Sequence, residues 1–265
     1  MSSLTQIQLK NPSVSAVEER GMNVIRSKVL IPICIFIFVS GSVEAASYTV
    51  LEDGVENGGT ISGRIILNGS PPPPKMLTVD EDAEACGGDR PAEELIVSHS
   101  GGLKNVVLSI DDIQSGKDWG LPDEFVYDQE KCKFTPRVLL LKPKASGVVM
   151  NSDPVGHNFH TISSGIYNIN KKMKAEASFS VAQNKIRRPG IVRVKCDIHS
   201  WMKGWWVVAK TPYTVLSDED GIFFITDIPP GTYTLQIWHE KLGETEQTVV
   251  IKAGETTEMD LALEL

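Results

Sequence analysis

Short stretches in which apolar and polar residues alternate follow one another from about residue 46 to the end of the chain. Residues 60–67 are rich in β-branched side chains, and residues 191–196 alternate, with Val192, Val194 and Cys196 on one face. Turn-forming pairs such as Asn68-Gly69 separate the stretches, and the four prolines at 71–74 exclude a helix there. The pattern predicts an all-β fold.

The same period of two predicts strands in a central and a C-terminal group. Residues 111–128, which follow the predicted strand at 103–110, are polar and contain Gly and Pro, which favours a surface loop. The further predicted strands are residues 95–98, 103–110, 137–141, 148–150, 178–181, 205–209, 222–225, 233–238, 248–252 and 259–263.

The first 45 residues differ from the rest and have the pattern of an export signal. Arg26 and Lys28 precede an apolar run at 29–39, and the small residues Val43 and Ala45 occupy the minus-three and minus-one positions of a cleavage site after Ala45. This predicts a signal peptide that is cleaved after Ala45, with Met22 as a possible start. The apolar run is shorter than a membrane span of about 20 residues, although an uncleaved anchor is the alternative. We therefore expect a periplasmic or otherwise exported protein without a stable membrane span.

Charge and cysteine count narrow the class of protein further. With 34 acidic and 26 basic residues the net charge is −8, and no basic stripe is present, which argues against nucleic acid as a partner. Cys86, Cys132 and Cys196 follow the signal, in a compartment where free thiols tend to oxidise. The odd number is explained if a metal holds Cys196 and Cys86 pairs with Cys132 in a disulfide. Two separate buried thiols are the alternative.

Candidate metal ligands lie at spacings of three in Cys196-Asp197-Ile198-His199-Ser200-Trp201-Met202. A tight loop would present the thiol, the imidazole and the thioether together, and either His157 or His160 can supply a second imidazole. Two imidazoles, a thiolate and a weak thioether are the ligands of a blue-copper site. Zinc also uses Cys and His but has little use for Met, so zinc and a site that has lost its metal are the alternatives.

These two motifs resemble those of the cupredoxins, and among them the amicyanins. The chain has His157-Asn158-Phe159-His160 followed by Cys196-x-x-His199-x-x-Met202-Lys203-Gly204. The resemblance covers about residues 95–210 and implies a Greek-key sandwich or barrel with one type 1 copper ion. By the resemblance, the ligands are His157, Cys196, His199 and Met202, and Asn158 forms a hydrogen bond across to the cysteine loop.

The C-terminal strands resemble a second family, the carboxypeptidase regulatory-like (prealbumin-like) module. Its Asp-Gly-x-Phe and Pro-Gly-x-Tyr signatures occur at residues 220–223 and 230–233. Its usual first strand occurs far upstream, at residues 61–67. We therefore expect residues 46–90 to complete a smaller sandwich formed by residues 211–265, with a cupredoxin domain at 91–210 inserted between them.

These features together predict an exported one-electron carrier that serves a redox partner protein and is not an enzyme. Copper enzymes of related fold need further imidazole clusters, and this chain has five His in all. We expect His199 to present its ring edge at the surface, with Trp201 in an apolar docking patch. The alternative is a non-redox module that holds copper or binds carbohydrate or another surface.

Overall fold

The computed structural model describes residues 48–265, and the predicted signal at residues 1–45 lies outside them. Nearly all of the regular structure in the described part is β-strand, so the predicted all-β class is confirmed. Helix α1 (Ala83–Cys86) is the only helix in residues 48–265, and no helix of this part could cross a bilayer.

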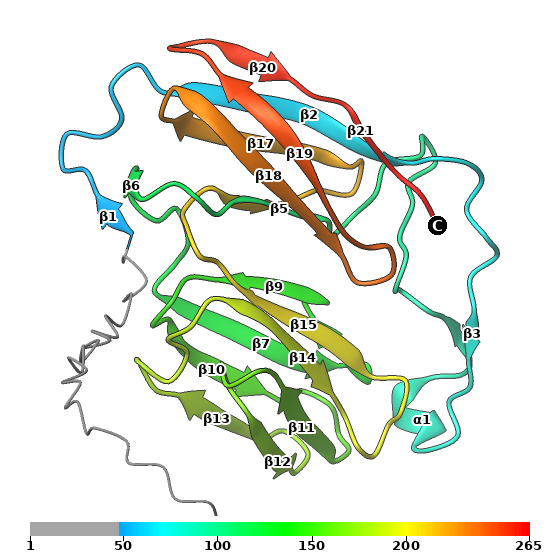
Figure 1. Cartoon of the computed structure of the whole chain (residues 1–265). Coiled ribbons are helices and arrows are strands. Elements are labelled where there is room, and N and C mark those ends of the chain that lie inside the picture. Colours follow the sequence, from blue (N-terminus) through cyan, green and yellow to red (C-terminus); the bar gives the residue numbers. More distant parts are fainter. Residues whose placement is uncertain (1–47) are drawn as a thin grey trace, which may run out of the picture. The chain divides into compact units, whose positions relative to one another are not determined.

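One sandwich, here called the first sandwich, packs a four-stranded sheet against a five-stranded sheet (Figure 1). The pairs β10–β7 and β15–β9 are parallel, and the other pairs are antiparallel. The four-stranded sheet has the order β13 (Ser178–Val181), β10 (Ser146–Met150), β7 (Glu124–Glu130), β8 (Lys133–Thr135). The five-stranded sheet has the order β12 (Ile169–Met173), β11 (His157–Ile162), β14 (Gly190–Lys195), β15 (Lys203–Val208), β9 (Val138–Leu141).

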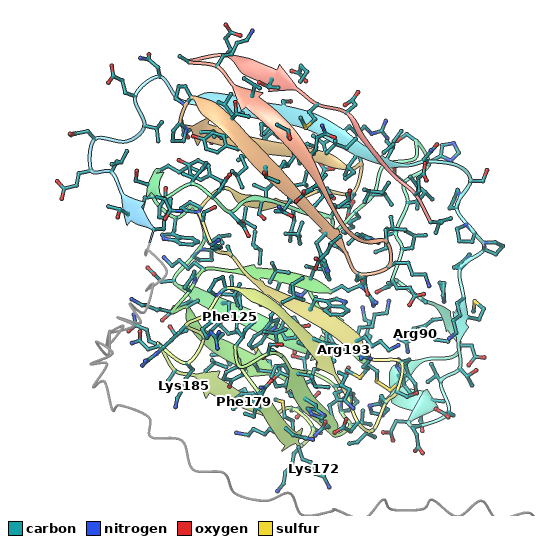
Figure 2. The ribbon with its side chains drawn as sticks, viewed as in Figure 1. Arg90, Phe125, Lys172, Phe179, Lys185 and Arg193 are labelled. Carbon is teal, nitrogen blue, oxygen red and sulfur yellow. A yellow bond between two sulfur atoms is a disulfide. The ribbon has the colours of Figure 1, made fainter. Side chains whose placement is uncertain are left out.

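Aromatic side chains fill much of the core of the first sandwich. Tyr127, Phe159 and Trp206 are fully buried, and the ring centroid of Trp206 lies 5.4 Å from each of the other two. Phe125, on β7, contacts the Trp206 ring edge to face. On β14 the side chains alternate in burial, and Arg193 is exposed between two buried valines (Figure 2). Complete burial of one such phenylalanine contributes about 1.5–3 kcal/mol to the stability of the fold.

The second sandwich contains the C-terminal strands together with two strands from far upstream (Figure 1). One sheet has the order β16 (Thr214–Leu216), β5 (Val107–Ile110), β18 (Gly231–His239), β19 (Gly243–Ile251). The other has the order β17 (Ile222–Ile228), β2 (Gly59–Leu67), β20 (Thr256–Glu258), with β21 (Leu261–Leu263) also paired to β2.

Strand β2 is the element that closes the second sandwich. It pairs antiparallel with β17 and parallel with both β20 and β21. Gly63 permits this arrangement, because a Cβ atom at that position would lie 1.9 Å from the carbonyl oxygen of Met259. The glycine of the predicted first strand is therefore explained by the close approach of the C-terminal segment.

The structure corrects the predicted boundaries of the inserted domain. β5 was predicted within 91–210, but it pairs with β16 and β18 of the second sandwich. Residues 46–90 are divided as well, because β2 belongs to the second sandwich while Val79 and Cys86 pack into the core of the first. Alternation shows which face of a strand is buried but not which core receives it, so the boundary could not be placed from the pattern.

Two short pairings and one unpredicted strand complete the fold. β1 (Thr49–Val50) pairs parallel with β6 (Ser115–Gly116), and β3 (Met76–Leu77) pairs antiparallel with β4 (Arg90–Pro91). The stretch 111–128 was predicted as a surface loop, but its last residues begin β7, which buries Phe125 and Tyr127. Val126 points outward and Gln129 inward, so the sequence of this strand does not alternate between polar and apolar residues.

A polar contact joins the two sandwiches, which fall within one compact unit. Glu240 accepts hydrogen bonds from the Arg137 guanidinium, with 2.7 Å between Nη2 and Oε2, and from Trp205 Nε1 at 2.9 Å. The Trp205 ring meets Trp238 edge to face at 5.3 Å. Only 6% of the Glu240 side chain is exposed, so this ion pair is largely shielded from solvent.

Candidate metal centre

The loop between β14 and β15 carries three of the predicted ligands. The strands pair up to Lys195 and Lys203, so residues 196–202 form a closed loop at the end of the sheet. Two backbone hydrogen bonds fold the loop tightly, from Cys196 N to Met202 O at 3.2 Å and from Met202 N to His199 O at 3.0 Å. Local sequence therefore sets the positions of all three ligands.

Strand β11 brings the second imidazole to this loop. β11 pairs with β14 so that His160 is opposite Lys195, which places His157 beside the cysteine loop. The Asn158 amide donates a hydrogen bond to Cys196 Sγ at 3.2 Å, and the Asn158 side-chain oxygen accepts one from Asp197 N at 3.3 Å. Asn158 thus connects the two ligand-bearing segments.

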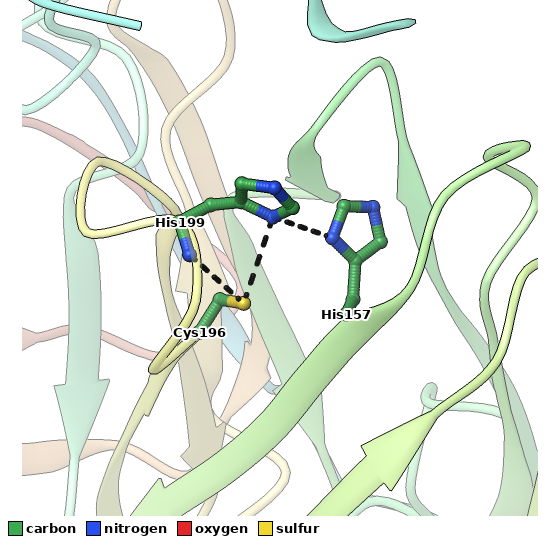
Figure 3. A group of neighbouring side chains, drawn as sticks. All are labelled: His157, Cys196 and His199. Atoms are coloured by element: carbon green, nitrogen blue, oxygen red, sulfur yellow. Dashed lines mark hydrogen bonds between the residues drawn. The ribbon is translucent and has the colours of Figure 1, made fainter. Parts of the chain in front are cut away.

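The potential metal-binding atoms of His157, Cys196 and His199 all lie within 4.8 Å of one another (Figure 3). The two Nδ1 atoms are 2.8 Å apart, and Cys196 Sγ is 3.8 Å from His199 Nδ1. Both imidazoles are fully buried, and Cys196 is 3% exposed. Met202, 1% exposed, packs in the same core cluster as Cys196.

The other nitrogen of each imidazole faces a carboxylate. His157 Nε2 is 2.7 Å from Asp153 Oδ2, and His199 Nε2 is 3.0 Å from Asp82 Oδ2. A carboxylate requires a proton on the nitrogen that faces it, so each neutral ring then has a bare lone pair on Nδ1. Two lone pairs 2.8 Å apart repel unless a cation lies between them. The donor set therefore fits a bound metal ion.

Burial and the neighbouring carboxylate of Asp153 act in opposite directions on the pKa of His157. Burial lowers the pKa of His157, while the hydrogen bond to Asp153 acts to raise it and the adjacent His199 acts to lower it. Asp153 is itself buried, and the backbone amides of Lys131 and Cys132 donate to its two oxygens at 2.6 and 2.8 Å. These hydrogen bonds satisfy a carboxylate that would otherwise be costly to bury.

Of the two candidate imidazoles, His157 and not His160 lies in the ligand cluster. His160 Nδ1 instead lies 3.0 Å from both carboxylate oxygens of Asp197. Hydrogen bonds from Lys195 and then from His160 lower the pKa of Asp197 to about 2. His160 therefore belongs to an ion-pair network that fixes the start of the cysteine loop.

The structure corrects the predicted docking surface at Trp201. Trp201 is 7% exposed, its Nε1 donates to the Cys132 carbonyl oxygen at 3.3 Å, and its ring lies 5.1 Å from that of His199. The ring edge of His199 was expected at the surface, but it is fully buried beneath Asp82. Two upstream segments contact these side chains, Trp201 at Cys132 and His199 at Asp82, and a motif confined to the ligand loop contains no information about either.

Cys86 and Cys132 form a disulfide with an S–S distance of 1.97 Å across a separation of 46 residues. It leaves Cys196 as the free cysteine of the described residues. Cys132 lies close to Asp153 and His157, within 4.8 Å between potential ligand atoms. Because the Cys132 sulfur is bonded to Cys86, these three residues are not an independent metal site.

The two carboxylates that face the imidazoles, Asp82 and Asp153, were not predicted from the sequence. Asp153 precedes His157 by four residues, between the predicted strand at 148–150 and the His157 motif. Asp82 is 117 residues from His199, in an acidic segment for which no strand was predicted. The neighbouring Cys86 was the available signal, because its pairing with Cys132 brings this segment to the site.

One family model matches the C-terminal part of the chain. The family model described as "Carboxypeptidase regulatory-like domain" matches residues 202–264. The match runs from Met202 through β15 of the first sandwich and the C-terminal strands of the second, whereas β2 and β5 of the second sandwich lie outside it. No curated protein matches the chain.

Solved structures similar to the chain include copper proteins, each matched over part of the chain. The copper-containing nitrite reductase of Thermus scotoductus SA-01 is 18% identical over 39% of this chain, with a TM-score of 0.30, and the match covers 26% of that protein. A purple cupredoxin from Nitrosopumilus maritimus is 18% identical over 32% of this chain and 98% of its own, with a TM-score of 0.27. A reduced amicyanin variant is 25% identical over 34% of this chain and 85% of its own, with a TM-score of 0.28.

Proposed function

We propose that the first sandwich binds one copper ion through His157, Cys196, His199 and Met202, and that the protein carries single electrons between redox partners. The observation that carries the proposal is the pair of imidazole Nδ1 atoms, 2.8 Å apart, beside the Cys196 thiol. Carboxylates hold the opposite nitrogens, so both lone pairs point at one place.

The ligand types favour copper over zinc. Cys196 and Met202 supply soft sulfur atoms, which suit copper, and a thioether is rarely a ligand of zinc. When bound, copper would supply a one-electron change of oxidation state. The amides of Asn158 and His199 donate hydrogen bonds to Cys196 Sγ at 3.2 and 3.4 Å, which hold the thiolate in place and tune its donation to the metal.

Burial of the site supports a carrier over an enzyme. The three clustered donor residues are each at most 3% exposed, so no position is open for a substrate molecule. Within residues 48–265, the remaining imidazoles serve elsewhere: His160 contacts Asp197, His239 accepts from backbone amides, and His99 is exposed. Ligands fixed by strand ends and a short loop need little rearrangement when the charge of the metal changes.

The disulfide supports an exported location, because such bonds persist in oxidising compartments. We place the protein in the periplasm or an equivalent exported space, with a redox protein as its partner.

A visible absorption spectrum of the protein with added Cu²⁺ tests the proposal. A thiolate bound to cupric copper gives an intense charge-transfer band in the visible range, so we expect a coloured protein that dithionite bleaches reversibly. Cys196→Ser removes the thiolate and should abolish the band, while Met202→Leu should keep the band and shift the reduction potential.

Two results would contradict the carrier. Binding of copper without an intense visible band would place a non-redox, copper-holding role ahead of it. Persistence of the band in Cys196→Ser would show that the loop does not supply the thiolate ligand.

A further inference from the structure

One segment of the first sandwich lies outside both ligand motifs in the sequence but contacts His199 of the candidate metal centre through Asp82. Residues 78–89, here called the strap, connect β3 to β4, and these two strands pair at the base of the strap. Val79 and Cys86 are buried in the same core cluster as Cys196. The strap is therefore part of the packed structure around the site.

Three further contacts fix the strap. Asp89 Oδ1 accepts a hydrogen bond from Val79 N at 2.9 Å across the strap. The disulfide joins Cys86 to Cys132. The guanidinium of Arg90, labelled in Figure 2, donates to the carbonyl oxygens of Lys131 and Cys86, the first at 2.7 Å.

Asp82 stands at the start of α1, where aspartate usually caps the helix with its side chain. Here the side chain forms no cap hydrogen bond, and the backbone has a left-handed φ of 49°. Aspartate tolerates this conformation better than most residues. Its carboxylate instead accepts from His199 Nε2 at 3.0 Å, and 41% of the side chain is exposed while His199 beneath it is fully buried. Asp82 thus lies between the imidazole and solvent.

We propose that Asp82 is a positioning residue of the metal centre and that the strap closes the centre to solvent. By accepting the Nε2 proton, Asp82 fixes the tautomer in which His199 Nδ1 carries the lone pair, and it holds the ring in place. The role of Asp82 in metal affinity and potential rests on the proposed copper site, whereas closure of the strap does not depend on any metal.

The disulfide links this carboxylate to the one on the other imidazole. Cys132 lies in the turn between β7 and β8, and the amides of this turn hold Asp153, which accepts from His157 Nε2. Cys86 follows Asp82 in the strap. One covalent bond therefore fixes the supports of both imidazoles, and loss of this bond should loosen the centre from both sides.

The first experiment needs no metal. In the folded apoprotein we expect a thiol reagent to modify Cys196 slowly, because the strap covers the centre. Asp82→Ala should accelerate this modification, because the contact that ties the strap to His199 is lost and the strap opens more readily. Glu84→Gln changes an exposed charge in the same strap and should leave the rate unchanged. Equal rates for Asp82→Ala and the wild type would overturn closure by the strap.

The second experiment separates positioning from packing. Asp82→Ala should weaken Cu²⁺ binding about 10- to 100-fold. Asp82→Asn retains an oxygen that accepts from Nε2, so it should recover most of the affinity, but it should raise the reduction potential because a negative charge beside the copper is lost. If both variants keep the affinity and the potential of Glu84→Gln, Asp82 is not a positioning residue.

A third variant tests the covalent link. Replacing both Cys86 and Cys132 by Ser should also accelerate modification of Cys196, which remains as the free thiol of the described part. Unchanged modification in a folded double variant would contradict the role of the disulfide. If the wild-type protein shows no intense copper band, the proposed copper carrier is refuted. Closure of the centre by the strap would still be tested, because the rates of Cys196 modification are measured without metal.

Discussion

The two sandwiches are both all-β, but they differ in what their cores contain. The core of the second sandwich is mainly aliphatic, with Tyr213 and Phe223 as its fully shielded aromatic residues. The core of the first is aromatic and also buries Asp153, His157 and His199. Among the described residues, the buried side-chain atoms without a hydrogen-bond partner all belong to the first sandwich, namely Tyr127 Oη, Gln129 Oε1 and Trp206 Nε1.

The first sandwich, which contains the candidate site, therefore also contains the buried polar groups that lower stability. An unpaired buried polar atom costs about 1–3 kcal/mol, and a buried carboxylate costs more unless backbone amides hold it. The first sandwich also has the disulfide, which contributes about 2–4 kcal/mol and offsets part of that cost. The second sandwich has no disulfide within the described residues and forms an ordinary hydrophobic core.

The largest predicted effect compares one phenylalanine from each core. Phe159 and Phe223 are 0% and 2% exposed, so replacing either by Ala should lower the free energy of unfolding by about 3–5 kcal/mol. Only Phe159→Ala should change the copper spectrum, because Phe159 follows the ligand-bearing residues of β11. Denaturant unfolding and visible absorption measure the two effects. Equal spectral changes in both variants would contradict the assignment of the site to one core.

A smaller effect tests whether the sandwiches unfold together. Glu240→Gln removes the charge that faces the Arg137 guanidinium across the two sandwiches, and it should cost about 1.5–3 kcal/mol. Glu244→Gln, at an exposed position on the neighbouring strand β19, serves as the control and should cost little. If the contact couples the sandwiches, Glu240→Gln should separate one denaturation transition into two. A variant as stable as the control would show that the contact contributes nothing.

How much of this could be predicted from sequence depended on the separation of the contacting residues. Cys196, His199 and Met202 all lie within residues 196–202, so their spacing alone predicts that they lie close together. The contact of Asp82 with His199 spans 117 residues and depends on the fold, so no local pattern indicates it. β5 was assigned to the wrong sandwich for the same reason, because its alternation fits either core. β7 was missed because apolar Val126 points outward and polar Gln129 points inward, so its sequence does not alternate although its burial does.

The smallest predicted effect concerns a buried histidine of the second sandwich. His239, at the end of β18, is 2% exposed, and its Nδ1 accepts from the amides of Lys241 and Leu242 at 3.3 Å. Burial lowers the pKa of His239 below the ordinary value of 6.5. The unfolded chain therefore takes up a proton near pH 6.5 while the folded chain does not, so stability is fully present above that pH and falls as the pH drops below it.

His157 shares this direction in the first sandwich, so the apoprotein should lose stability on acidification through both histidines. His239→Asn keeps an acceptor for the two amides but cannot take up a proton, and it should flatten part of the decline between about pH 7 and about pH 5. The control variant His99→Asn, at an exposed position, should leave this decline unchanged. Urea unfolding of the metal-free variants across this range measures the slopes. If the stability of His239→Asn declines with falling pH as much as that of the wild type, His239 contributes nothing to the acid sensitivity. The sensitivity would then arise in the first sandwich alone.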